Sequence, residues 1–169
     1  MKRFALLAVA MLALAACQPK PVAKADDPAA AAPSAESNAY MAKATKEAGV
    51  QVLKSGLAYK VVRAGPTTGL KPQLKDEVKV HYEGKLEDGT VFDSSYERGQ
   101  PAAMPLEGLI PAWQEALQLM RPGDEWLLYV PSNLGYGEEG AGQIPPGAPL
   151  IFRIELIDVL PAPGRIQQG

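Results

Sequence analysis

The sequence has a single cysteine and a single histidine among its 169 residues. A disulfide framework needs at least two cysteines, and a zinc site of cysteine and histidine needs three or four such ligands, so both are excluded. The 17 lysines and arginines are balanced by 19 aspartates and glutamates, and no window gathers five or six basic residues. A surface that follows the phosphates of a nucleic acid is therefore not expected.

Long apolar runs are also missing. Lys2 and Arg3 precede uncharged residues 4–16, which would span about 20 Å as a helix against about 30 Å of bilayer hydrocarbon. A positive start, a short apolar stretch and small residues at its end are typical of a secretory signal peptide. We therefore interpret residues 1–16 as a signal that is removed from the mature chain.

The residues around Cys17 are more specific than a general signal. Leu14, Ala15, Ala16 and Cys17 resemble the lipobox of bacterial lipoprotein precursors. By that resemblance the chain is cleaved before Cys17, which then carries lipid chains, palmitate among them, that anchor it stably to a membrane. The absence of aspartate at Gln18 implies the outer membrane of the cell envelope, facing the periplasm. The alternative is an ordinary signal peptide with an incidental cysteine.

A spacer and a short helix are expected between the signal and the folded domain. Residues 18–39 contain four prolines, and Val22 is their only apolar residue larger than alanine, so they cannot bury a core. We interpret residues 17–39 as a lipidated tether. Ser37 or Asn38 would cap a helix over residues 40–48, which Gly49 would end. Residues 49–163 then form the domain, and residues 164–169 form a tail.

Short strand patterns, separated by glycine and proline turns, follow from residue 50 onward. Val78, Val80 and Tyr82 alternate with polar residues, which predicts a strand with one core face and one wet face. A hairpin turn is expected at Asp88 and Gly89. The expected strands cover residues 57–62, 77–83, 90–92, 125–130 and 150–160.

One convincing helix begins near Pro111 and ends at residues 122–123. Its apolar residues recur at helical spacing and share one face: Trp113, Ala116, Leu117 and Met120. Several strands with one helix and a long late loop predict an α+β fold, in which one antiparallel sheet wraps around one short helix.

Five motifs appear in order along this domain. They are VHYEG at 80–84, DGTVFDSS at 88–95, IPAW at 110–113, LGYG at 134–137 and IPP at 144–146. Together they resemble an FKBP-type peptidyl-prolyl cis-trans isomerase domain over about residues 49–160. The resemblance implies a half-barrel sheet around the helix, an apolar pocket between them, and proline-containing polypeptides as substrates. It also implies macrolide inhibitors of the family as candidate ligands.

The chemistry of this reaction explains why an apolar pocket suits it. An X–Pro amide rotates over a barrier of about 20 kcal/mol because resonance must be broken. No bond is cleaved, so the reaction needs no nucleophile, metal or cofactor. It needs a dry pocket that fits the twisted amide better than either planar form.

The resemblance also assigns roles to individual residues. Trp113 forms the pocket floor, while the Ile110 backbone N–H and the Tyr136 hydroxyl hold substrate carbonyls. Asp93 orients or polarises rather than transferring a proton. The catalytic residues implied in this way are Asp93, Tyr82, Phe92 and Tyr136, and the substrate-binding residues are Leu109, Ile110, Trp113, Phe152 and Arg98.

Each of these residues also has a simpler structural explanation. Trp113, Tyr82 and Phe152 lie at positions that commonly face a core, and Asp93 can cap a turn. The isomerase itself has two alternatives. One is a membrane-tethered proline-peptide binding or chaperone module with little turnover, and the other is a purely structural envelope lipoprotein.

Two side chains often used in catalysis are assigned structural roles. His81 alternates onto the polar face of its strand, so we interpret it as structural or solvated. Ser94 and Ser95 have no expected base partner, which argues against a hydrolase triad. Trp126 alternates with apolar strand residues and is expected in the core.

The sequence departs from the family pattern at three places. Ala102 stands where the family often has an aromatic wall, Ala141 stands at the late-loop tip where some members have histidine, and the loop over 136–145 is about one residue short. A smaller wall predicts weaker binding of substrate or inhibitor. Only about ten residues are available for a helix before the domain, whereas exported relatives that dimerise have long ones, so a monomer is predicted.

Overall fold

The computed structural model describes residues 32–165. The expected signal peptide, Cys17 and most of the tether lie outside the described residues. Seven strands form one antiparallel sheet in the order β1-β2-β6-β7-β3-β4, and β5 pairs with β3. Among residues 32–165, no helix has the length and apolar character needed to span a membrane.

Strands and helices are numbered in the order in which they occur along the chain. The strands are β1 (Val50–Val52), β2 (Ala58–Arg63), β3 (Glu77–Leu86), β4 (Val91–Ser94), β5 (Ala102–Pro105), β6 (Glu125–Val130) and β7 (Leu150–Leu160). The helices are α1 (Ala35–Ala44) and α2 (Pro111–Leu117), and the 3-10 turns are η2 (Leu106–Gly108) and η3 (Ser132–Leu134). The predicted antiparallel α+β fold is confirmed, and the expected bounds of β6 and β7 coincide with those observed.

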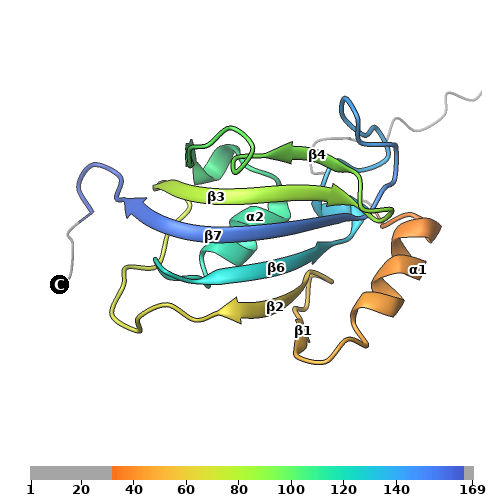
Figure 1. The fold of residues 1–169 in the computed structure, drawn as a ribbon, viewed down its shortest axis with the longest axis horizontal. Coiled ribbons are helices and arrows are strands. Elements are labelled where there is room, and N and C mark those ends of the chain that lie inside the picture. The colour runs from red at the N-terminus through yellow and green to blue at the C-terminus, as the bar shows by residue number, and fades with distance from the viewer. Residues whose placement is uncertain (1–31, 166–169) are drawn as a thin grey trace, which may run out of the picture.

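The sheet forms its core with α2, which lies behind it in Figure 1. β3 buries Val78, Val80 and Tyr82, as its alternation predicts. β7 pairs with both β3 and β6, so it forms the centre of the sheet. Trp126 is buried in this core, as expected, and it stacks on Tyr59 at 4.3 Å between ring centroids.

α2 presents the predicted apolar face to the sheet. Pro111 occupies the start of the helix, where its missing N–H leaves no hydrogen bond unmade. Trp113 and Leu117 are buried, and the helix ends at Leu117, earlier than the predicted stop at 122–123. Met120 lies beyond the helix but is fully buried, because the following turn keeps it against the core.

α1 begins earlier than the sequence predicts, so the expected helix over residues 40–48 is wrong. Ser34 forms its N-cap, because the Ser34 side chain accepts a hydrogen bond of 3.0 Å from the Ser37 backbone N–H. Met41 and Ala44 pack on the sheet, where they meet Tyr129. Tyr129 alternates with core residues of β6, so α1 covers the face of the sheet opposite α2.

Two strands were not expected, and both are short. β1 has three residues and pairs only with β2. β5 contains two alanines and a proline, which are poor strand formers. Pairing with β3 makes this segment a strand, in a register that sets Met104 opposite Val78 and Ala102 opposite Val80.

Candidate active site

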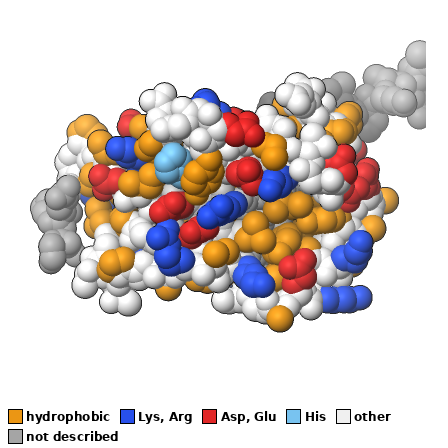
Figure 2. Space-filling view, in the orientation of Figure 1, with side chains coloured by type: hydrophobic (Ala, Val, Ile, Leu, Met, Phe, Trp, Pro, Cys, Tyr) orange, Lys and Arg blue, Asp and Glu red, His pale blue; other side chains and the backbone are white. Residues whose placement is uncertain are grey.

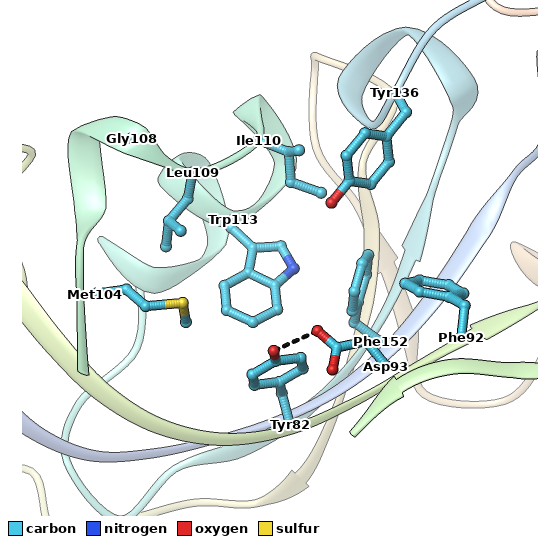
Figure 3. Close-up of a pocket in the computed structure, with 10 residues that line it drawn as sticks. All are labelled: Tyr82, Phe92, Asp93, Met104, Gly108, Leu109, Ile110, Trp113, Tyr136 and Phe152. Carbon is cyan, nitrogen blue, oxygen red and sulfur yellow. Dashed lines mark hydrogen bonds between the residues drawn. The ribbon is translucent and has the colours of Figure 1, made fainter. Parts of the chain in front are cut away.

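A cavity of about 290 Å³ opens between the sheet and α2. Figure 3 shows its lining, to which the sheet contributes aromatic side chains and the segment before α2 contributes aliphatic ones. The lining residues are Tyr82, Phe92, Asp93, Met104, Gly108, Leu109, Ile110, Trp113, Tyr136 and Phe152. The structure therefore brings together every catalytic and substrate-binding residue expected from the sequence except Arg98, which lies at the rim.

The floor of the pocket is the indole of Trp113, which is only 3% exposed. Its ring meets Tyr82 edge to face at 5.1 Å and Phe152 at 5.3 Å between centroids. Phe92 meets Phe152 in the same way at 5.6 Å. Edge-to-face aromatic pairs hold each other in orientation, so the floor and this wall form one rigid cluster.

Gly84 makes room for this aromatic cluster. A Cβ at Gly84 would lie 2.6 Å from Phe92 Cζ and 2.8 Å from Phe152 Cε1, well inside van der Waals contact. The residue sits in β3 two residues beyond Tyr82, so it continues the core-facing series of that strand. Only glycine lets the two phenylalanine rings approach the strand backbone this closely.

Asp93 carries the one carboxylate that lines the pocket. Its Oδ2 accepts a hydrogen bond of 2.5 Å from the Tyr82 hydroxyl, and its Oδ1 pairs with the Arg98 guanidinium. Arg98 also donates to the Tyr82 hydroxyl oxygen over 2.8 Å. The three groups form a closed triangle, so the side chain of Asp93 is held by Tyr82 and Arg98.

The triangle also fixes the charge states of its members. Burial alone would raise the pKa of Asp93, but the hydrogen bonds from Tyr82 and Arg98 outweigh it and lower that pKa. Burial, followed by the hydrogen bond to Asp93, raises the pKa of Tyr82. At neutral pH the pocket therefore contains an aspartate anion and a protonated tyrosine, and Asp93 has no proton to donate.

Ser95 fixes the backbone of Tyr82 where β3 lies between its partners β4 and β5. The Ser95 N–H donates to the Tyr82 carbonyl over 2.9 Å, and the Tyr82 N–H donates to Ser95 Oγ over 2.8 Å. Ser95 is fully buried. These bonds replace the missing ladder contacts and set the direction of the Tyr82 side chain.

One expectation about Ser95 is wrong. His81 Nδ1 lies 3.0 Å from Ser95 Oγ, so this serine does have an imidazole neighbour. The pair is still not a hydrolase site, because the Ser95 hydroxyl is completely buried and already bonded to the backbone of Tyr82. His81 stacks on Tyr96 at 4.6 Å and does not line the pocket, in agreement with its predicted structural role.

Two residues that line the pocket, Ile110 and Tyr136, each carry a hydrogen-bond donor. Tyr136 is 39% exposed and turns its hydroxyl toward the pocket (Figure 3). Burial, followed by the negative charge of Asp93, raises the pKa of Tyr136, which keeps the hydroxyl protonated. The Ile110 carbonyl caps α2, and within residues 32–165 the Ile110 N–H makes no hydrogen bond. Both groups are thus available to an incoming carbonyl.

A family model described as FKBP-type peptidyl-prolyl cis-trans isomerase matches residues 69–157. The chain belongs to this family. A second model, described as the domain amino terminal to FKBP-type peptidyl-prolyl isomerase, matches residues 8–61. The family resemblance drawn from the five sequence motifs is confirmed.

Known FKBP-type proteins are similar over about three quarters of the chain. The peptidyl-prolyl cis-trans isomerase Mip of Coxiella burnetii is 53% identical over 125 residues, which cover 73% of this chain and 54% of that protein. The outer membrane protein MIP of Legionella longbeachae is 46% identical over 126 residues, covering 74% and 53%. The crystal structure of FkpA from Escherichia coli gives a TM-score of 0.72 at 44% identity, covering 76% and 60%. The chain spans about half the length of the curated relatives it matches.

The FKBP-type pocket contains two residues that the motifs did not reveal. Met104 lines the pocket two residues beyond Ala102, which does not line it. Both residues stand opposite core-facing positions of β3, so strand alternation would have found Met104 if β5 had been recognised. Gly108 contributes no side chain, and no sequence signal marks it.

Among residues 32–165, no three side chains of histidine, cysteine, aspartate or glutamate are grouped to bind a metal ion.

Proposed function

We propose that this protein is a peptidyl-prolyl cis-trans isomerase that rotates X–Pro bonds in exported polypeptides by a non-covalent mechanism. The observation that carries the proposal is the aromatic pocket itself. Its floor and walls are apolar, and its one carboxylate is kept anionic by Tyr82 and Arg98. Such a site offers no nucleophile to attack an amide, but it offers a dry, shaped surface for a proline ring.

Burial of the proline ring against Trp113 would remove the X–Pro amide from water. The planar amide is more dipolar than the twisted one, so the loss of water raises the planar form more and lowers the barrier between them. Catalysis of this kind depends on shape and polarity, and it leaves no covalent intermediate. The rigid packing of Trp113, Tyr82 and Phe152 supports this role.

Polar groups at the rim would orient the peptide chain. The Ile110 N–H and the Tyr136 hydroxyl are donors of two pocket-lining residues, and each would hold one substrate carbonyl. If the carbonyls on both sides of the proline are held, rotation is confined to the bond between them. Asp93 would act through its fixed negative charge and through the position it gives to Tyr82 and Arg98.

The test is the cis/trans exchange of a short X–Pro peptide. The full chain should accelerate exchange well above the uncatalysed rate, which has a time constant of tens to hundreds of seconds. Exchange no faster than the blank contradicts an isomerase. If a proline peptide still binds the pocket in that case, the protein is a binding or chaperone module.

We also propose that Cys17 carries a lipid anchor after removal of residues 1–16. The proposal rests on the lipobox-like residues 14–17 and on the name of the Legionella relative, outer membrane protein MIP. It implies a domain held at the cell envelope, in the outer membrane and facing the periplasm. A precursor with Cys17→Ser should lose membrane association while its domain stays folded by circular dichroism. Retention in the membrane fraction contradicts the anchor.

The remaining proposals concern assembly and inhibition. α1 has 10 residues, or about 15 Å of helix, which supports a monomer because it gives little length for a helical dimer stalk. Sedimentation of the chain at two concentrations tests this, and a mass that rises to twice the chain mass contradicts it.

Macrolide inhibitors of the family should compete with a proline peptide for the pocket, and simultaneous binding of both contradicts that proposal.

A further inference from the structure

The loop between β6 and β7 carries Tyr136, and its geometry depends on one carbonyl oxygen. The backbone N–H groups of Gly135 and Gly137 both donate to the Ser132 carbonyl, over 3.0 Å and 2.9 Å. These two glycines flank Tyr136 in the sequence. The position of Ser132 therefore sets the position of the Tyr136 backbone.

Ser132 is in turn held by the segment that precedes the domain. Its N–H donates to Ser37 Oγ over 2.9 Å, and its Oγ accepts the Ser34 N–H over 3.0 Å. Ser37 and Ser132 are both almost completely buried. Two residues of the first turn of α1 thus bind the base of the active-site loop, although they lie about 95 residues away in the sequence.

A second contact binds the far end of the same loop. The Ser34 hydroxyl donates to the Gly147 carbonyl over 2.6 Å, and the Gly147 N–H donates to the Gly137 carbonyl over 2.8 Å. A Cβ at Gly147 would lie 2.9 Å from Ser34 Cβ, so the Ser34 side chain packs closely against the Gly147 backbone. We call the bonds that join Ser34 and Ser37 to Ser132 and Gly147 the serine bridge.

The serine bridge closes a circuit from the N-cap of α1 through Ser132, Gly137 and Gly147 and back to Ser34. α1 itself is fixed on the sheet by Met41 and Ala44. Figure 1 shows α1 beside the end of the sheet at which β6 leads into this loop. The loop is therefore fastened to a packed helix as well as to its own strands.

We propose that the serine bridge positions the Tyr136 hydroxyl at the pocket, so that Ser34 and Ser37 are positioning residues for the isomerase. This inference rests on the proposed function, since it assigns Tyr136 a role in holding substrate. By this proposal, the segment that precedes the domain contributes to the geometry of the active site. A loop released from the bridge keeps Tyr136 but no longer holds its hydroxyl in one place.

The variant Ser34→Asp separates the bridge from the helix cap. Aspartate caps helices as well as serine does, because its carboxylate accepts the Ser37 N–H. An ionised carboxylate cannot donate, so it loses the bond to the Gly147 carbonyl. Ser34→Asp should therefore leave α1 folded by circular dichroism and speed amide hydrogen exchange at Gly137 and Gly147 in the full chain.

Turnover gives the second readout. If Ser34→Asp costs the hydrogen bond between the Tyr136 hydroxyl and the substrate, kcat/KM on an X–Pro peptide should fall by about fivefold. In a Tyr136→Phe background, which has no hydroxyl to position, Ser34→Asp should change kcat/KM by less than about twofold. Equal losses in the two backgrounds would overturn the proposal, since they would show that Ser34 does not act through the Tyr136 hydroxyl.

The matched control is Thr45→Ala at the other end of α1. The Thr45 hydroxyl donates to the Met41 carbonyl, so this variant removes a helix hydrogen bond without touching the loop. It should leave exchange at Gly147 and turnover unchanged. Unchanged exchange at Gly137 and Gly147 in Ser34→Asp would also overturn the proposal. A full chain without isomerase activity would contradict the proposed function. Amide exchange needs no turnover, so it would still decide whether the serine bridge holds the loop.

Discussion

The phenolic hydroxyl of Tyr82 donates a hydrogen bond of 2.5 Å to Oδ2 of Asp93 at the mouth of the pocket. The two side chains come from adjacent antiparallel strands, where Gly84 stands opposite Asp93. The bond joins an aromatic wall to the only anionic group in the lining. Charge and shape in this site are therefore set by the same contact.

The first prediction removes that anion. Asp93→Leu should lower kcat/KM on an X–Pro peptide by about tenfold or more, because a hydrogen bond to a charged group is worth about 1.5–3 kcal/mol. Phe92→Ala should also slow exchange, since it removes one wall of the pocket. Circular dichroism should show an intact fold in both variants. The matched control is Asp88→Leu in the exposed hairpin turn, which should retain full turnover. Unchanged turnover in both pocket variants would show that the site is misplaced.

The second prediction concerns stability at low pH. The pKa of Asp93 is lowered in the folded protein, so its stabilising contribution is present above about pH 4 and is lost as the pH falls through the folded value. Asp93→Asn should therefore be less stable than the native chain at pH 7 by less than about 1 kcal/mol, a small value because the side chain is 41% exposed.

Urea unfolding at several pH values measures this contribution. The difference in the free energy of unfolding between the native chain and Asp93→Asn should be constant from pH 7 to 5 and should shrink below pH 4. A difference that grows on acidification would contradict the lowered pKa. Asp88→Asn is not a suitable control here, because the pKa of Asp88 is also lowered, by hydrogen bonds from Thr90.

The third prediction uses the two tryptophans as reporters. Trp113 forms the pocket floor, whereas Trp126 stacks on Tyr59 in the core. A saturating proline peptide should change the fluorescence of Trp126→Phe, in which Trp113 is the remaining indole. The same peptide should leave the fluorescence of Trp113→Phe unchanged. A macrolide inhibitor of the family should act in the same way. No response in either variant would favour a purely structural lipoprotein.

Regular patterns made most of the fold predictable. β3, β6 and β7 are long enough to show alternation, and the apolar face of α2 follows helical spacing, so these elements were found. β1 and β5 were missed because three or four residues hold too little pattern, and β5 is a strand only through its pairing with β3. α1 was misplaced because Ser34, Ser37 and Asn38 are all good caps, and packing of Ser37 against Ser132 decides among them.

The site was predicted in part for a related reason. Motifs revealed the aromatic floor and Asp93, since these residues lie within short motifs that resemble those of an FKBP-type domain. Met104 lies in the strand that was missed. The contact between Ser34 and Gly147 joins residues 113 positions apart, and no local pattern in the sequence reports a contact of that range.

The fourth prediction tests why the pocket needs glycine in β3. Gly84→Ala would place a Cβ 2.6 Å from Phe92 Cζ and 2.8 Å from Phe152 Cε1. The two rings must move, and overpacking of this kind typically costs about 1–3 kcal/mol of stability. Thermal or urea unfolding should show that loss, and turnover should fall because the displaced rings line the pocket.

The double variant with Phe92→Leu separates the rings from other causes. Leucine has no Cζ or Cε2, the two Phe92 atoms nearest the added Cβ, so it relieves one of the two close approaches. Gly84→Ala should therefore destabilise the Phe92→Leu chain by less than it destabilises the native chain, by about 1 kcal/mol or more, as expected for residues in direct contact. The same loss in both backgrounds would mean that Phe92 is not what excludes a side chain at Gly84.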